Sequence, residues 1–91
     1  MGSIQINKSH QLGREEAHRR IEALETELHQ KYGVTLDWEG DHANVKASSV
    51  SGELVVDDAE LTLQLKLGLA LLPVQGKIRS ELDQQLERAL A

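Results

Sequence analysis

The chain has no cysteine and no phenylalanine, and its only Tyr or Trp residues are Tyr32 and Trp38. Without cysteine there are no disulfides, thiolate nucleophiles or thiolate metal ligands, a composition typical of proteins from a reducing cytoplasm. Two such aromatic side chains are too few to form a platform on which nucleic-acid bases stack. The composition therefore argues against disulfide-stabilised secreted modules, cysteine enzymes and single-strand nucleic-acid binders.

Positive charge is also scarce, since 10 Lys and Arg residues stand against 15 Asp and Glu residues, for a formal charge of -5. A negative protein repels the phosphate backbone, so we expect no nucleic-acid partner. No apolar run approaches the roughly 20 residues of a membrane span, and the first residues do not resemble a signal peptide. We expect a cytoplasmic protein of one domain, residues 1–91, that buries roughly 60% of its unfolded surface.

The first half of the chain changes its hydrophobic period once. Ile4 and Ile6 alternate with polar residues over residues 3–8, which predicts a half-buried strand. Residues 13–33 then carry apolar side chains three or four positions apart, which predicts an amphipathic helix. That apolar stripe consists of Ala17, Ile21, Leu24, Leu28 and Tyr32.

Alternating segments joined by turn residues follow, and they predict antiparallel hairpins. The expected strands cover residues 34–39, 42–48, 53–57 and 61–67, with turns at 40–41, 50–52 and 57–59. Each strand has one apolar face, as expected for a sheet covered on one side only. The last segment predicts a helix with Pro73 near its first turn and with an apolar stripe at four-residue spacing. That stripe consists of Val74, Ile78, Leu82, Leu86 and Leu90.

These elements predict an α+β fold with the order β-α-β-β-β-β-α. We expect an antiparallel sheet of four to five strands with two amphipathic helices packed on one face, similar to a reduced helix-grip fold. The predicted layers leave one question, because the run Leu69, Ala70, Leu71 and Leu72 cannot wholly face a core. Either these leucines close the end of the sandwich, or Leu69, Leu71 and Leu72 form an exposed apolar docking surface.

Polar side chains do not form a recognisable catalytic or metal site. His18, Glu22, Glu25 and His29 share the polar side of the first helix, but they lack the close spacing of a zinc motif, so we expect a solvated face. The alternate acidic residues of segment 37–41 do not complete a calcium loop. No serine stands in a nucleophile elbow, and no glycine-rich phosphate loop is present. We therefore expect no enzyme, no catalytic residue, no metal and no cofactor.

Trp38 is predicted to point inward from its strand. Its large ring is either an anchor of the core or a surface on which a ligand stacks.

Several short segments, in their order along the chain, resemble the family of polyhydroxyalkanoic acid system proteins. They are HQL at 10–12, EA at 16–17, YGV at 32–34, WEGD at 38–41, VSG at 50–52, LGLALL at 67–72 and GKIRSEL at 76–82. Pro73 departs from the pattern. The resemblance covers nearly the whole chain and implies a bacterial accessory protein of polyhydroxyalkanoate storage, without catalytic residues to carry over.

Three functions follow from the residues and the resemblance together. The first is a non-enzymatic accessory protein that binds the polyhydroxyalkanoate granule surface or a granule-associated protein through Leu69, Leu71 and Leu72. The second is a protein that binds a small apolar acyl or hydroxyacyl ligand beneath the helices, where Ala43 and Ala47 leave room. The third is a homodimeric interaction module that uses the leucine run or a sheet edge.

Overall fold

A five-stranded antiparallel sheet carries two helices, and the computed structural model describes residues 2–91. The strands are β1 (Gly2–Ser9), β2 (Thr35–Glu39), β3 (His42–Ala47), β4 (Val50–Val56) and β5 (Glu60–Leu67). The helices are α1 (Arg14–Tyr32) and α2 (Gln75–Leu90), and the short 3-10 segment η1 (Leu69–Val74) precedes α2. The predicted α+β class and order of elements are confirmed.

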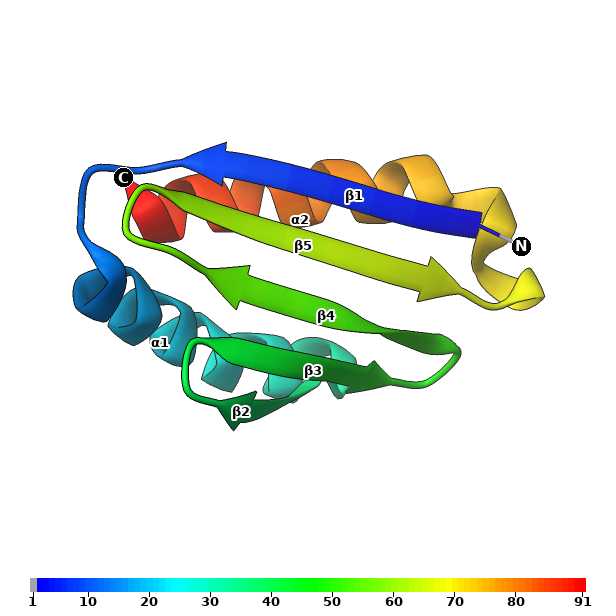
Figure 1. Cartoon of the computed structure of the whole chain (residues 1–91). Helices are drawn as coiled ribbons and strands as arrows, with labels where there is room; N and C mark the ends of the chain where they lie inside the picture. The colour runs from blue at the N-terminus through cyan, green and yellow to red at the C-terminus, as the bar shows by residue number, and fades with distance from the viewer. Residues whose placement is uncertain (1) are drawn as a thin grey trace.

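The sheet has the strand order β1-β5-β4-β3-β2, and every neighbouring pair is antiparallel (Figure 1). Strands β2 to β5 follow one another as hairpins. Strand β1 pairs with β5, so the first strand in the sequence completes the sheet beside the last one. The two free edges of the sheet are therefore β1 and β2.

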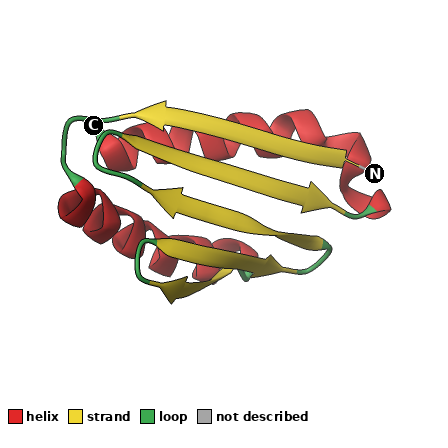
Figure 2. Ribbon diagram, in the orientation of Figure 1, coloured by secondary structure: helices red, strands yellow, loops and turns green. Residues whose placement is uncertain are grey.

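Both helices lie on the same face of the sheet, and the other face is open (Figure 2). The buried residues of each strand alternate with exposed ones, as in β5, where Leu61, Leu63, Leu65 and Leu67 point toward the helices. The alternation found in the sequence is thus explained by one covered face and one wet face. The core also includes apolar residues from all the other strands and both helices.

One predicted turn is wrong. Residues 50–52 belong to β4, and the chain turns between β3 and β4 at Ser48 and Ser49, with Ser49 at a positive φ of 61°. Gly52 pairs with Val45 on one side and Leu65 on the other. A Cβ atom at Gly52 would overlap the carbonyl oxygen of Gln64. The glycine therefore permits close approach of two strands instead of forming the turn.

The chain leaves the sheet at Gly68, whose N–H donates to the Ser49 carbonyl oxygen at 2.8 Å. A Cβ atom at this position would lie 3.3 Å from the Ser49 Cβ, so a small residue suits this crossing of two backbones. Pro73 lies within η1, and α2 begins after it at Gln75. Segment η1 therefore crosses one end of the molecule before the chain turns back as α2.

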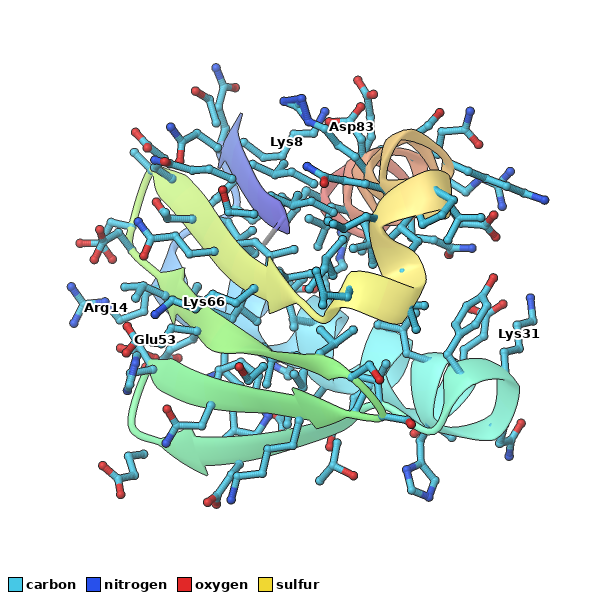
Figure 3. All side chains as sticks on the ribbon, turned by 90° about the vertical axis from the view of Figure 1, so that its right-hand side faces the viewer. Lys8, Arg14, Lys31, Glu53, Lys66 and Asp83 are labelled. Carbon is cyan, nitrogen blue, oxygen red and sulfur yellow. The ribbon has the colours of Figure 1, made fainter. Side chains whose placement is uncertain are left out.

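Side chains of α2 cover the free edge of β1. The Gln75 side-chain amide donates to the Ser3 carbonyl oxygen at 2.9 Å, and the Lys8 Nζ lies 2.9 Å from an Asp83 carboxylate oxygen (Figure 3). The Gln75 contact occupies a backbone carbonyl group that an unprotected edge strand would offer to another chain.

Candidate functional site

The two helices run antiparallel across the sheet and diverge toward one end (Figure 1). At the opposite end, here called the closed end, the Arg20 guanidinium on α1 donates to the carbonyl oxygen of Ala89 on α2 at 3.2 Å. Near this end the stripes of both helices are buried, with Ile21 1% and Leu86 4% exposed. The helices are therefore in direct contact at one end of the sandwich.

Toward the other end both apolar stripes become exposed. On α1 the last stripe residue, Tyr32, is 50% exposed, and on the opposite side Val74, just before α2, is 42% exposed. Ile78 and Leu82 on α2 are half-buried. Side chains predicted to lie in the core thus border an opening.

The space between the diverging helices is an apolar cavity of about 460 Å³. Its floor is the inner face of β2, β3, β4 and β5, and its walls come from α1, η1 and α2. The apolar lining residues are Ile21, Leu24, Leu28, Val34, Leu36, Val45, Ala47, Val50, Leu54, Leu63, Leu65, Leu71, Val74, Ile78, Leu82 and Leu86. The volume falls in the range of small-molecule sites, roughly 300 to 1,000 Å³.

Small side chains on the floor help to keep this space open. Val45, Ala47 and Val50 line the cavity near the turn between β3 and β4. Ala43, which was also expected to leave room, is fully buried and lies outside the lining. The expected room beneath the helices is therefore found beside Ala47 at the end of β3, and not beside Ala43 near its start.

Only five of the described lining residues are polar, namely Tyr32, Ser48, Lys77, Glu81 and Gln85. The Tyr32 hydroxyl donates to Glu81 Oε1 at 2.7 Å, which joins the last residue of α1 to α2. This hydrogen bond is the main cause that raises the pKa of Tyr32 above its ordinary value of 10.0. The helices are thus joined by polar contacts at the open end as well as at the closed one.

The leucines of the run at 69–72 differ in burial. Leu69 is 73% exposed, whereas Leu71 is half-buried and lines the cavity. Leu72 is half-buried, and its side chain lies where a Cβ atom on Gly2 would have to fit. The run therefore combines one exposed leucine with two that close the sandwich in part, and the docking surface stays a prediction.

Trp38 lies away from the cavity, at the edge of the sheet under α1. Its ring stacks on the His18 imidazole with centroids 4.0 Å apart, and its Nε1 donates to Glu25 Oε1 at 3.3 Å. The other Glu25 oxygen accepts the backbone N–H of Leu36 at 3.1 Å. Trp38 is half-buried, packs against the core and fastens β2 to α1, which is the geometry of an anchor.

These contacts correct in part the expectation of a solvated polar face on α1, where Glu22 and His29 are exposed as expected. His18 and Glu25 are partly buried against β2, and His18 Nδ1 lies 3.3 Å from Asp41 Oδ1. Asp41 also pairs with Arg14 at 3.3 Å, so this acidic hairpin is tied to the start of α1. Within residues 2–91 no three His, Asp or Glu side chains gather as metal ligands.

The sequence did not reveal the Tyr32–Glu81 contact or the polar wall of the cavity. A signal was present in α2, where Lys77, Glu81 and Gln85 repeat at four-residue spacing beside the apolar stripe. Such a row on the border of a stripe marks a helix whose neighbour does not fully cover it.

Among the described residues, no helix combines the length and the apolar character that crossing a membrane requires.

Comparison with known proteins adds one finding. The family model described as putative polyhydroxyalkanoic acid system protein matches residues 4–90. No curated protein and no solved structure matches the chain significantly.

Proposed function

Because the chain belongs to the family of polyhydroxyalkanoic acid system proteins, we propose that it is a non-enzymatic accessory protein that binds an acyl or hydroxyacyl chain. The family description links the protein to polyhydroxyalkanoate systems. The proposed site is the cavity between α1, α2 and the sheet. The apolar character of this cavity is the observation that carries the proposal.

The walls of the cavity suit a flexible hydrocarbon chain. Sixteen of the described lining residues are apolar, and the polar ones lie on the two helices and at Ser48. Each methylene that moves from water into such surroundings contributes about 0.8 kcal/mol before the costs of ordering the ligand. An acyl chain of moderate length would therefore gain enough apolar contact for measurable binding.

A binding role is proposed because the described lining offers little catalytic chemistry. It includes no His, Cys or Asp, and no base is hydrogen-bonded to the Ser48 hydroxyl within residues 2–91. The Tyr32 hydroxyl is engaged with Glu81. These groups are better suited to orienting a ligand than to activating a nucleophile.

Titration calorimetry with decanoate tests the proposal. We expect the wild type to bind one molecule, with a negative heat-capacity change because apolar surface is buried. The variant Ala47→Phe fills the cavity from its floor and should abolish binding. Ala23→Phe on the exposed side of α1 is the matched control and should bind as the wild type does. Absence of binding to the wild type would refute the proposal.

Granule binding is a second candidate, and the exposure of Leu69 favours it. Leu69, Val74 and Tyr32 are the large apolar residues exposed within residues 2–91, and Val74 and Tyr32 border the cavity. Exposed apolar residues grouped in this way favour contact with an apolar surface. The polyester of a storage granule is such a surface, and adsorption to it should resist high salt.

Sedimentation with washed polyhydroxyalkanoate granules tests this candidate. We expect the wild type to sediment at low and at high salt, and Leu69→Ser to remain in solution. The change should cost little stability because Leu69 is 73% exposed. Ala23→Ser on α1 serves as the control. Equal sedimentation of wild type and Leu69→Ser would remove Leu69 from the contact.

A further inference from the structure

We propose that the cavity selects a hydroxy acid, with Lys77 binding its carboxylate and Glu81 accepting a hydrogen bond from a nearby hydroxyl. This inference rests on the proposed function and names the head group of its ligand. It follows from the placement of the two charged residues in the cavity lining.

Lys77 and Glu81 lie on the same wall of the cavity. They are four residues apart in α2, which places them about 6 Å apart along the helix axis. Both line the cavity, so both side chains belong to the face of α2 that is turned toward α1. Two polar groups separated by a few bonds at the head of one ligand can therefore reach both residues.

Lys77 supplies a cation that is free to receive a carboxylate. It makes none of the ion pairs found among residues 2–91, and the first turn of α2 contains no acidic residue. Lys77 is exposed, and an ammonium group at the border of the cavity binds an anion without needing a fixed planar geometry. The acyl chain then extends over the apolar residues while its carboxylate remains at the wall.

Glu81 supplies an acceptor whose orientation is fixed. Its Oε1 receives the Tyr32 hydroxyl at 2.7 Å, while no hydrogen bond within the described chain reaches its Oε2. A carboxylate oxygen accepts from a neutral hydroxyl but repels a second carboxylate. Glu81 therefore favours a ligand hydroxyl at this point, and Tyr32 acts as a positioning residue.

The position of the hydroxyl provides a sharp test. Calorimetry would compare decanoate, β-hydroxydecanoate and ω-hydroxydecanoate, the last of which carries its hydroxyl at the far end of the chain. We expect β-hydroxydecanoate to bind roughly twofold to tenfold more tightly than decanoate, the range of one net hydrogen bond. The ω isomer should bind no better than decanoate, because its hydroxyl would enter the apolar part of the cavity.

Two variants assign the head-group contacts. Glu81→Met should remove the preference for β-hydroxydecanoate over decanoate, whereas Glu87→Met on the exposed side of α2 should retain this preference. Lys77→Met should weaken decanoate and leave methyl decanoate unchanged, with Lys66→Met on the open sheet face as control (Figure 3). Glu81→Leu, which also lacks an acceptor, replaces Glu81→Met if circular dichroism shows that the latter does not fold.

The outcomes separate this inference from the proposed function. If decanoate does not bind to the wild type, both fail together. If decanoate binds and β-hydroxydecanoate binds equally well, only the hydroxy-acid inference is overturned. A preference that persists in the folded Glu81 variant would likewise overturn the role given to Glu81.

Discussion

At the scale of single residues, Tyr32 lies at the boundary between the core and the solvent. Its place in the stripe of α1 predicts a core side chain, yet half of it is exposed and its hydroxyl reaches Glu81 on the other helix. A tyrosine can do this because its ring packs on apolar neighbours while its hydroxyl remains in polar surroundings.

The Tyr32–Glu81 contact predicts a raised tyrosine pKa that is directly measurable. Tyr32 is the only tyrosine, so alkaline titration of the phenolate absorbance reports on this residue alone. We expect a midpoint above the ordinary value of 10.0, because ionisation would break the hydrogen bond and place two negative charges together. In Glu81→Met the midpoint should fall back toward the ordinary value.

The sign of the pH dependence follows from the same shift. A pKa raised in the folded state means that the contact stabilises the fold fully below the unfolded value, and that this contribution disappears as pH rises through the folded value. Glu87→Met should leave the midpoint where it is in the wild type. An identical midpoint in wild type and Glu81→Met would show that the contact does not form in solution.

Sequence reasoning about single residues succeeded where burial alone decides the outcome. The positions of Ile21, Leu24 and Leu86 in apolar stripes were sufficient to predict a core. The partners of His18 and Glu25 could not be predicted. They lie on or beside β2, and the register of this strand depends on its pairing with the rest of the sheet.

At the scale of elements, the two edge strands are protected in different ways. Strand β1 receives side chains from α2, whereas β2 is held by Glu25 of α1, which accepts hydrogen bonds from the Leu36 backbone and the Trp38 ring. Protected edges of this kind oppose pairing of two sheets edge to edge. They give no support to a dimer that forms through a sheet edge.

Loss of the Glu25 contacts should destabilise the protein. In Glu25→Ala the Leu36 and Trp38 N–H groups lose their acceptor, and we expect the free energy of unfolding to fall by about 1 to 3 kcal/mol. Urea denaturation followed by Trp38 fluorescence measures this change. Glu27→Ala removes only an exposed pair with Lys31 and should cost less than Glu25→Ala does. Equal losses in both variants would contradict the assigned role of Glu25.

The elements themselves were largely predictable, and their junctions were not. Strict alternation in β5 and the stripe of α1 each correspond to one structure only, so both elements were found. The turn between β3 and β4 was misplaced because Gly52 resembles a turn residue, whereas its lack of a side chain serves close strand contact. The leucine run has no period, so its burial depended on how η1 crosses the end of the sheet.

At the scale of the whole molecule, the space between the two helices widens from one end of the sandwich to the other (Figure 1). The helices are joined directly near Arg20 and Ala89, and they diverge toward Tyr32 and Val74, where the Tyr32–Glu81 hydrogen bond bridges them across the cavity (Figure 1). The spacing of apolar residues shows which face of each helix is turned inward. It does not show how far apart the two helices lie, because this distance depends on the side chains of both helices and on the twist of the sheet beneath them.

Mapping decanoate by the methyl resonances of the labelled protein is the most direct test of the central claim. We expect shifts at Leu28, Leu71, Ile78 and Leu82, which line the cavity, and none at Leu61, which lies in the core outside it. Shifts that saturate at one decanoate per chain and include these four residues would establish the cavity as the binding site. Shifts confined to Leu69, or none at all, would contradict the account.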